Sequence, residues 1–106
     1  KYILRDTFRI EFHNEINAWI NAFIQNVDVV YVTIDLDGFS SAYAPGVSAP
    51  SPMGFTPDVV LASLKTIIAS GKLTALDIAE LNPTYDIDDQ TARLAASLVH
   101  TLIHSL

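Results

Sequence analysis

The chain has 106 residues, of which 50% are hydrophobic and 17% are charged, and these values predict one globular domain or a piece of one. Twelve acidic residues against six basic ones give a formal net charge of −6, which argues against nucleic acid and anionic membrane surfaces as partners. Cysteine is absent, and no apolar run approaches the roughly 20 residues of a spanning helix, so we expect a soluble cytoplasmic protein without disulfides or thiolate metal sites.

The first third of the chain contains a strand candidate at residues 2–4 and an ambiguous alternating stretch at residues 8–12. A helix with one apolar face is predicted for residues 15–27, because apolar side chains recur there at steps of three and four. Residues 29–34 are nearly all apolar or β-branched, which is typical of a strand covered on both faces in a parallel sheet. The apolar positions of the helix are Ile16, Trp19, Ile20, Phe23, Ile24 and Val27.

A long loop rich in Gly, Pro, Ser and Ala is predicted for residues 35–56, and loops of this length in compact domains are usually functional. Thr56 and Pro57 are typical of a helix start, and Gly71 is placed to end that helix. A second strand is predicted within residues 73–81, interrupted by Asn82-Pro83. A last helix runs from about residue 88 to the end, with its core face carried by leucines at positions 94, 98, 102 and 106.

The alternation of strands and helices predicts an α/β fold with a parallel sheet and helices on both faces. Ligands of such sheets bind outside the carboxyl ends of the strands. Asp35, Asp37 and Glu80 follow two predicted strands at that end, so we expect the three acids to share one crevice.

Asp35 and Asp37 are candidate ligands of Mg²⁺ or Mn²⁺, because residues two apart on a strand point to the same side and these cations prefer oxygen ligands. The alternative is that acids near a strand end simply favour the turn. For Glu80, the residues alone leave two possibilities open: a solvated rim residue, or a partner of an amidinium or guanidinium group, whose parallel N–H donors match a carboxylate.

Other titratable residues fit structural roles better. His100 and His104 are four apart on the last helix but share its polar row with Arg93 and Ser97, so we expect solvated histidines; His13 is isolated. The acids at positions 86, 88 and 89 are expected to cap the last helix and occupy its first turn.

Two segments together resemble a known family. "VYVTIDLDGFSSAYAPGVSAPSPMGF" is similar to the signature of the ureohydrolases, the arginase, agmatinase and formimidoylglutamase superfamily, in which a strand ends in Asp-x-Asp and a Pro-Gly loop follows. "ALDIAELNPTYD" resembles the next strand of that family, with its Glu-x-Asn-Pro. Ser40-Ser41 and the run from Pro45 to Pro50, together with "NPTYDIDDQTARLAA", are most similar to the formimidoylglutamases.

The resemblance implies an arginase-like three-layer α/β/α fold and two Mn²⁺ ions holding a bridging hydroxide. This hydroxide would attack the amidine carbon of N-formimidoyl-L-glutamate and release formamide and glutamate, as in histidine degradation. Carried over to this sequence, Asp35 and Asp37 would be metal ligands and Glu80 would orient the amidinium, with no further catalytic residue assigned. Relatives also imply a homo-oligomer.

The sequence departs from the family in lacking the Gly-Gly-Asp-His and Asp-x-His-x-Asp segments that supply the remaining ligands. We therefore expect residues 1–106 to be the C-terminal portion of a single ureohydrolase domain, weak in metal binding, inactive when isolated, and prone to self-association through exposed sheet surface.

Three alternatives remain beside this hypothesis. One is a guanidine hydrolase of the arginase or agmatinase type. Another is a Mg²⁺-dependent phosphatase of the haloacid dehalogenase type, which would use Asp35 as nucleophile; however, Lys65 and Lys72 fall on or just after a predicted helix, where the required lysine is not expected. The third is a non-catalytic module.

Overall fold

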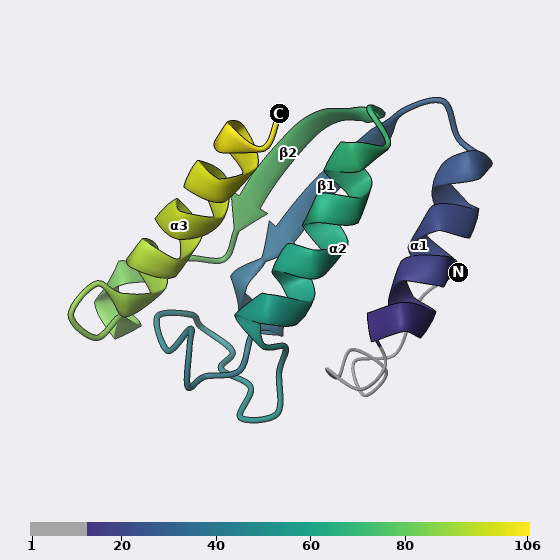
Figure 1. The fold of residues 1–106 in the computed structure, drawn as a ribbon. Helices are drawn as coiled ribbons and strands as arrows, with labels where there is room; N and C mark the ends of the chain where they lie inside the picture. Colours follow the sequence, from purple (N-terminus) through teal and green to yellow (C-terminus); the bar gives the residue numbers. More distant parts are fainter. Residues whose placement is uncertain (1–12) are drawn as a thin grey trace.

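The computed structural model describes residues 13–106, and the strand candidate at residues 2–4 and the ambiguous stretch at residues 8–12 lie outside this range. Helix α2 lies in front of strand β1, with α1 on one side of it and α3 on the other (Figure 1). Two short 3₁₀ helices follow the strands: η3 comes directly after β1, and η4 begins after a further three residues beyond β2. The elements in chain order are α1 (His13–Gln25), β1 (Val30–Asp35), η3 (Leu36–Gly38), α2 (Pro57–Ala69), β2 (Leu73–Ala79), η4 (Pro83–Tyr85) and α3 (Gln90–His104).

Strands β1 and β2 pair in parallel, which confirms the predicted α/β class and strand direction. An irregularity in register next to Val30 leaves Thr74 without an opposite residue, and from Tyr31 onward the pairing is regular up to Asp35 opposite Ala79. The two carboxyl ends therefore coincide. Glu80, which directly follows Ala79, begins at the same edge of the sheet as the acidic turn after β1.

Apolar side chains from all three helices cover one face of this sheet. The apolar stripe of α1 packs with Val30 and Val59, while Leu64 of α2 and Leu98 of α3 pack with Ile34. The helical periodicity read from the sequence is thus confirmed as the core-forming pattern. The buried residues of the α1 stripe are Ile16, Ile20 and Ile24.

The opposite face of the sheet is exposed in the described part of the chain. Tyr31 is 60% exposed, and Thr33, Ala75 and Asp77 are exposed beside it. The Tyr31 hydroxyl donates a hydrogen bond to the Asp77 carboxylate across the two strands. The expectation that residues 29–34 are covered on both faces is therefore corrected for this range, because no described helix packs on that side; the second helical layer of the predicted arrangement is not formed by residues 13–106.

The ends of the elements follow the local chemistry, with small shifts. Pro57 begins α2 and Gly71, at φ 72°, follows its end, as predicted, although Thr56 makes no side-chain cap hydrogen bond. Strand β2 ends at Ala79 because Glu80 turns to a φ of 75°. Helix α3 begins at Gln90, two residues later than predicted, because the backbone at positions 88 and 89 is also left-handed.

Candidate active site

The acidic turn after β1 consists of Asp35, Leu36 and Asp37. The strand ends at Asp35, and the side chain of Asp35 accepts a hydrogen bond of 2.9 Å from the backbone N–H of Asp37, which closes the 3₁₀ turn η3. Leu36 is fully buried beneath it. Strand alternation therefore does not explain how Asp35 and Asp37 are brought together, because Asp37 lies in the turn; the turn hydrogen bond joins them instead.

The carboxylate of Asp37 carries an oxygen that is unusual for a folded protein. Its Oδ1 is buried and has no hydrogen-bond partner, whereas buried polar atoms in proteins are nearly always paired. A hard divalent cation is a partner that such an oxygen can take, and the second oxygen of Asp35 is a further donor of the same kind. The donor chemistry of this turn therefore fits Mg²⁺ or Mn²⁺.

The described residues do not complete a coordination sphere. Within residues 13–106, no group of three or more His, Cys, Asp or Glu side chains is arranged to hold a metal ion. Asp35 and Asp37 would thus hold a cation together with donors from elsewhere or from water.

Glu80 lies at the same edge of the sheet, on an unusual backbone. Its φ of 75° lies in the left-handed region, which non-glycine residues rarely occupy, and its side chain is exposed. Strained conformations of this kind persist only where the surrounding structure holds them in place, and they cluster at functional sites. The strand register puts Glu80 one residue beyond the pair Asp35–Ala79, and no local sequence pattern indicates its backbone conformation.

The long loop predicted for residues 35–56 packs directly onto the acidic turn. Phe55 donates its N–H to the Gly38 carbonyl at 2.7 Å, and Ser40 donates to the Phe55 carbonyl at 2.8 Å. A Cβ added at Gly54 would lie 2.3 Å from the backbone of Phe39, so glycine is required for this close approach. The base of the loop is therefore fixed to the turn that carries Asp37.

The far end of the loop is attached to the segment that follows β2. Asn82 donates its N–H to the Gly46 carbonyl at 2.7 Å, and its side-chain amide donates to the Ser48 hydroxyl at 3.0 Å. The Gly46 N–H donates to the hydroxyl of Thr91 at 2.7 Å, and Thr91 is fully buried in the first turn of α3. The sequence does not predict these contacts, because the partners are up to 45 positions apart.

Asp86 caps the first turn of α3, as predicted, although it lies four residues before the helix. The other part of the expectation was wrong, because Asp89 makes no side-chain cap hydrogen bond and no acid lies in the first turn. Its carboxylate accepts backbone hydrogen bonds from Ile87 at 3.0 Å, Thr91 at 2.9 Å and Ala92 at 3.1 Å. Desolvation by itself raises the pKa of Asp86, but the hydrogen bonds from the Thr91 N–H and hydroxyl, Ala92 and Ile87 together lower that pKa below its ordinary value.

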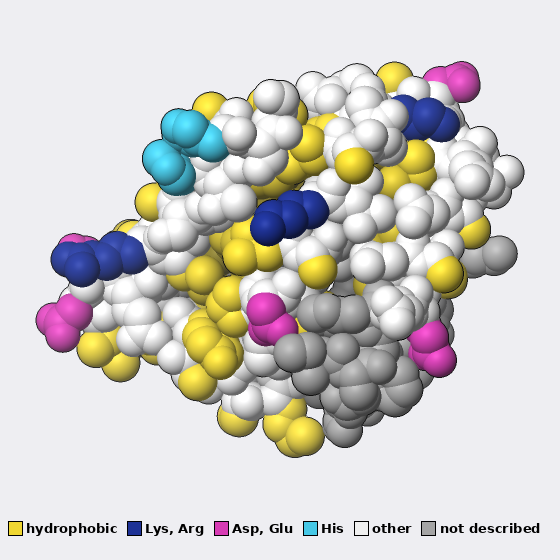
Figure 2. Space-filling view, viewed as in Figure 1, with side chains coloured by type: hydrophobic (Ala, Val, Ile, Leu, Met, Phe, Trp, Pro, Cys, Tyr) yellow, Lys and Arg dark blue, Asp and Glu magenta, His cyan; other side chains and the backbone are white. Residues whose placement is uncertain are grey.

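The histidines lie apart from this edge. His100 and His104 are exposed near the end of α3, with ring centroids 4.1 Å apart, and Nδ1 of His104 contacts the His100 carbonyl at 2.8 Å. Figure 2 shows histidine side chains over the α3 part of the surface. His13 is the first residue of α1.

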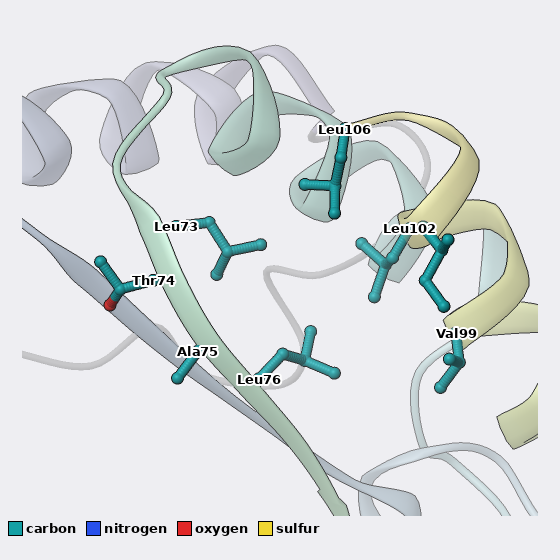
Figure 3. A pocket seen from close by; sticks show the side chains of 8 residues that line it. Leu73, Thr74, Ala75, Leu76, Val99, Leu102 and Leu106 are labelled. Carbon is teal, nitrogen blue, oxygen red and sulfur yellow. The ribbon is translucent and has the colours of Figure 1, made fainter.

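Two hollows flank the sheet. A hollow of about 290 Å³ lies between the first half of β2 and the last turns of α3, with Leu76, Leu102 and Leu106 pointing into it (Figure 3). Since it lies at the amino end of β2, it is remote along the strand from Glu80. A second hollow, of about 430 Å³, is lined by apolar residues of β1 and α2 and includes Asp35 in its wall.

The chain belongs to the arginase family, whose model matches residues 3–104. Within that family, formimidoylglutamases are among the most similar proteins. The formimidoylglutamase of Rhodococcus jostii (strain RHA1) is 42% identical over 103 residues, covering 97% of this chain and 32% of the relative. That of Staphylococcus aureus (strain MRSA252) is 46% identical over 99 residues, covering 93% and 32%.

Solved structures show the same relationship. The formimidoylglutamase of Bacillus subtilis subsp. subtilis str. 168 aligns with a TM-score of 0.86 at 25% identity, over 97% of this chain and 32% of that chain. The arginase of Bacillus caldovelox aligns with a TM-score of 0.82 at 26% identity, over 95% and 34%. The expected family and fold are therefore confirmed, and the chain spans about a third of the length of these relatives. No helix in residues 13–106 is long and apolar enough to cross a membrane.

Proposed function

We propose that this chain is the part of a manganese-dependent amidine hydrolase that supplies two metal-binding carboxylates and a substrate-orienting glutamate. The observation that carries the proposal is the buried, unpartnered Oδ1 of Asp37 in a turn closed by Asp35, at the same sheet edge as Glu80. Identities of 42–49% to formimidoylglutamases support N-formimidoyl-L-glutamate as the substrate.

In this proposal, Asp35 and Asp37 hold the cations and keep them at the carboxyl end of β1. When bound, a pair of Mn²⁺ ions supplies an activated water for attack on the amidine carbon. Glu80 would accept two parallel N–H bonds from the amidinium and fix its orientation. In the overall reaction, the oxygen of one water bonds to the amidine carbon, the bond between that carbon and the glutamate nitrogen breaks, and both protons of the water pass to that nitrogen, which gives formamide and L-glutamate.

The test is a hydrolase assay on the complete product of the gene that encodes this chain, with Mn²⁺ present. N-Formimidoyl-L-glutamate, agmatine and arginine are offered separately, and formamide or urea is measured. Formamide from the first substrate supports the proposal; urea from either guanidine compound supports the guanidine hydrolase alternative. No hydrolysis of any of the three would favour a non-catalytic module. Membership in the arginase family gives the phosphatase alternative no support.

The role of Glu80 is tested by Glu80→Gln, which removes the charge and keeps the shape. A hydrogen bond to a charged group contributes about 1.5–3 kcal/mol, so kcat/KM is expected to fall about 10- to 150-fold. Glu15→Gln makes the same change on the exposed surface of α1 and is expected to leave kcat/KM unchanged. Equal activity of Glu80→Gln and the parent would refute the assignment of Glu80.

Two broader expectations stay predictions. The resemblance implies a homo-oligomer, which light scattering after size-exclusion chromatography of the complete gene product tests. A cytoplasmic location rests on composition and on the absence of cysteine.

A further inference from the structure

The proposed chemistry does not explain the backbone conformation of the residues that follow β2. Glu80 leaves the strand with a φ of 75°, and a non-glycine residue keeps such a conformation only where neighbouring contacts hold it. The next described contact along the chain is at Asn82, whose N–H donates to the Gly46 carbonyl at 2.7 Å. The side chain of Asn82 adds two hydrogen bonds, donating to Ser48 and accepting from the N–H of Thr84.

Gly46 is itself held from the other side by α3. Its N–H donates to the hydroxyl of Thr91, which is fully buried. Thr91 is in turn held by Asp86, whose carboxylate accepts a hydrogen bond of 2.9 Å from the backbone N–H of Thr91. The fit is tight, since a Cβ on Gly46 would lie 2.6 Å from the Asp86 carboxyl carbon.

These contacts form one chain of hydrogen bonds from Asp86 through Thr91 and Gly46 to Asn82, two residues after Glu80. The same loop is attached at its base to the turn that carries Asp37, through the pairing of Phe55 with Gly38. The loop thus connects the metal-binding turn to the glutamate by a second route, in addition to the pairing of β1 with β2.

We propose that Thr91 and Asp86 are positioning residues of the hydrolase site, which hold Glu80 in place through Gly46 and Asn82. The inference rests on the proposed function and deepens it, because it names residues outside the substrate crevice that set the geometry of the glutamate. The proposal gives both residues a role that acts through Asn82, without contact to substrate or metal.

The experiment compares Thr91→Val with Thr91→Ser in the complete gene product. Valine keeps the size of threonine but removes the hydroxyl that accepts the hydrogen bond from Gly46, whereas serine retains this hydroxyl. We expect Thr91→Val to lower kcat/KM for N-formimidoyl-L-glutamate at least 10-fold and Thr91→Ser to stay within about threefold of the parent. Thr101→Val makes the same change on α3 about three turns further along and is the matched control.

A double-mutant cycle separates positioning from general damage to the fold. If Thr91 acts through Glu80, then Thr91→Val will change kcat/KM less than twofold in the Glu80→Gln background. An equal loss in both backgrounds, or full activity of a folded Thr91→Val variant, overturns the proposal. If Thr91→Val does not fold, Asp86→Asn takes its place in the same cycle, with the same two results deciding.

Amide hydrogen exchange tests the coupling without turnover. Peptides that cover residues 42–48 and 80–86 are expected to exchange at least 10-fold faster in Thr91→Val than in Thr91→Ser, while α2 stays unchanged. Unchanged exchange at residues 80–86 overturns the proposal. An inactive parent that still shows the coupled exchange would refute the proposed reaction while leaving the hydrogen-bonded connection to Glu80 established.

Discussion

Replacing Gly46 by alanine probes the contact between the loop and α3 most directly. The added Cβ would lie 2.6 Å from Cγ and Oδ1 of Asp86, and 2.7 Å from its Cβ, which is closer than Cβ atoms approach other atoms. Gly46 is buried, and both its N–H and its carbonyl are hydrogen bonded, to Thr91 and Asn82. The backbone therefore cannot move away without weakening at least one of these bonds.

The expected loss of stability follows from two contributions. Overpacking costs about 1–3 kcal/mol, and a weakened hydrogen bond costs about 1 kcal/mol, so Gly46→Ala is expected to lower the free energy of unfolding by about 2–4 kcal/mol. Gly71→Ala is the matched control, because it makes the same change in the unfolded chain. Gly71 has a φ of 72° and no atom within 4 Å of an added Cβ, so its cost is the left-handed strain of about 1–2 kcal/mol, partly offset in the unfolded state.

Urea unfolding followed by circular dichroism measures both variants against the parent, with the slope of the transition checked for constancy. A Gly46→Ala variant that loses no more stability than Gly71→Ala would refute the described packing of the loop on Asp86.

Three further predictions concern charged groups. Without metal, Asp37→Asn is expected to be at least as stable as the parent, because it removes a buried unpartnered charge. The variant is also expected to lose the rise in melting temperature that Mn²⁺ gives the parent. A variant that keeps this Mn²⁺-dependent rise would contradict the assignment of Asp37 as a metal ligand. Because the pKa of Asp86 is lowered in the folded chain, its carboxylate stabilises the fold above the unfolded pKa of about 3.8, and this stabilisation is lost as pH falls through the folded pKa. The difference in the free energy of unfolding between the parent and Asp86→Asn, measured with urea, should therefore shrink from pH 6 to pH 3. A difference that does not change with pH would refute the prediction. Lys72→Met should cost about 1–2 kcal/mol in urea unfolding, because the Lys72 ammonium donates to the carbonyls of Ile24 and Val27 at the end of α1 at 2.7 and 2.8 Å; a loss under 0.5 kcal/mol would contradict this capping role.

The elements that the sequence predicts well are those determined by local pattern. The spacing of apolar residues in α1, the β-branched run of β1, and Pro57 and Gly71 around α2 all act within a few residues, so they can be read one segment at a time. Parallel pairing also follows from the alternation of elements, and it places Asp35 and Glu80 at one edge. The candidate site was found in the sequence for this reason.

Local sequence patterns do not predict the contacts that hold the site together. The side chain of Asp35 captures the N–H of Asp37, and this competition with the strand produces a turn that strand alternation cannot predict. The hydrogen bond between Gly46 and Thr91 joins positions 45 apart, and neither residue type by itself indicates such a partner. The left-handed conformation of Glu80 is equally invisible in the sequence, because glutamate carries no preference for it.

The acidic turn and the long loop stabilise different parts of the candidate site. Hydrogen bonds within the described residues join Asp35 to Asp37 and attach the long loop to Asn82, two residues after Glu80, yet they leave Oδ1 of Asp37 without a partner. The hydrogen bonds therefore account for the shape of the turn, while the charge of the Asp37 carboxylate calls for a partner that they do not supply. A cation that binds Asp37 in the folded chain and not in the unfolded chain would therefore raise the free energy of unfolding.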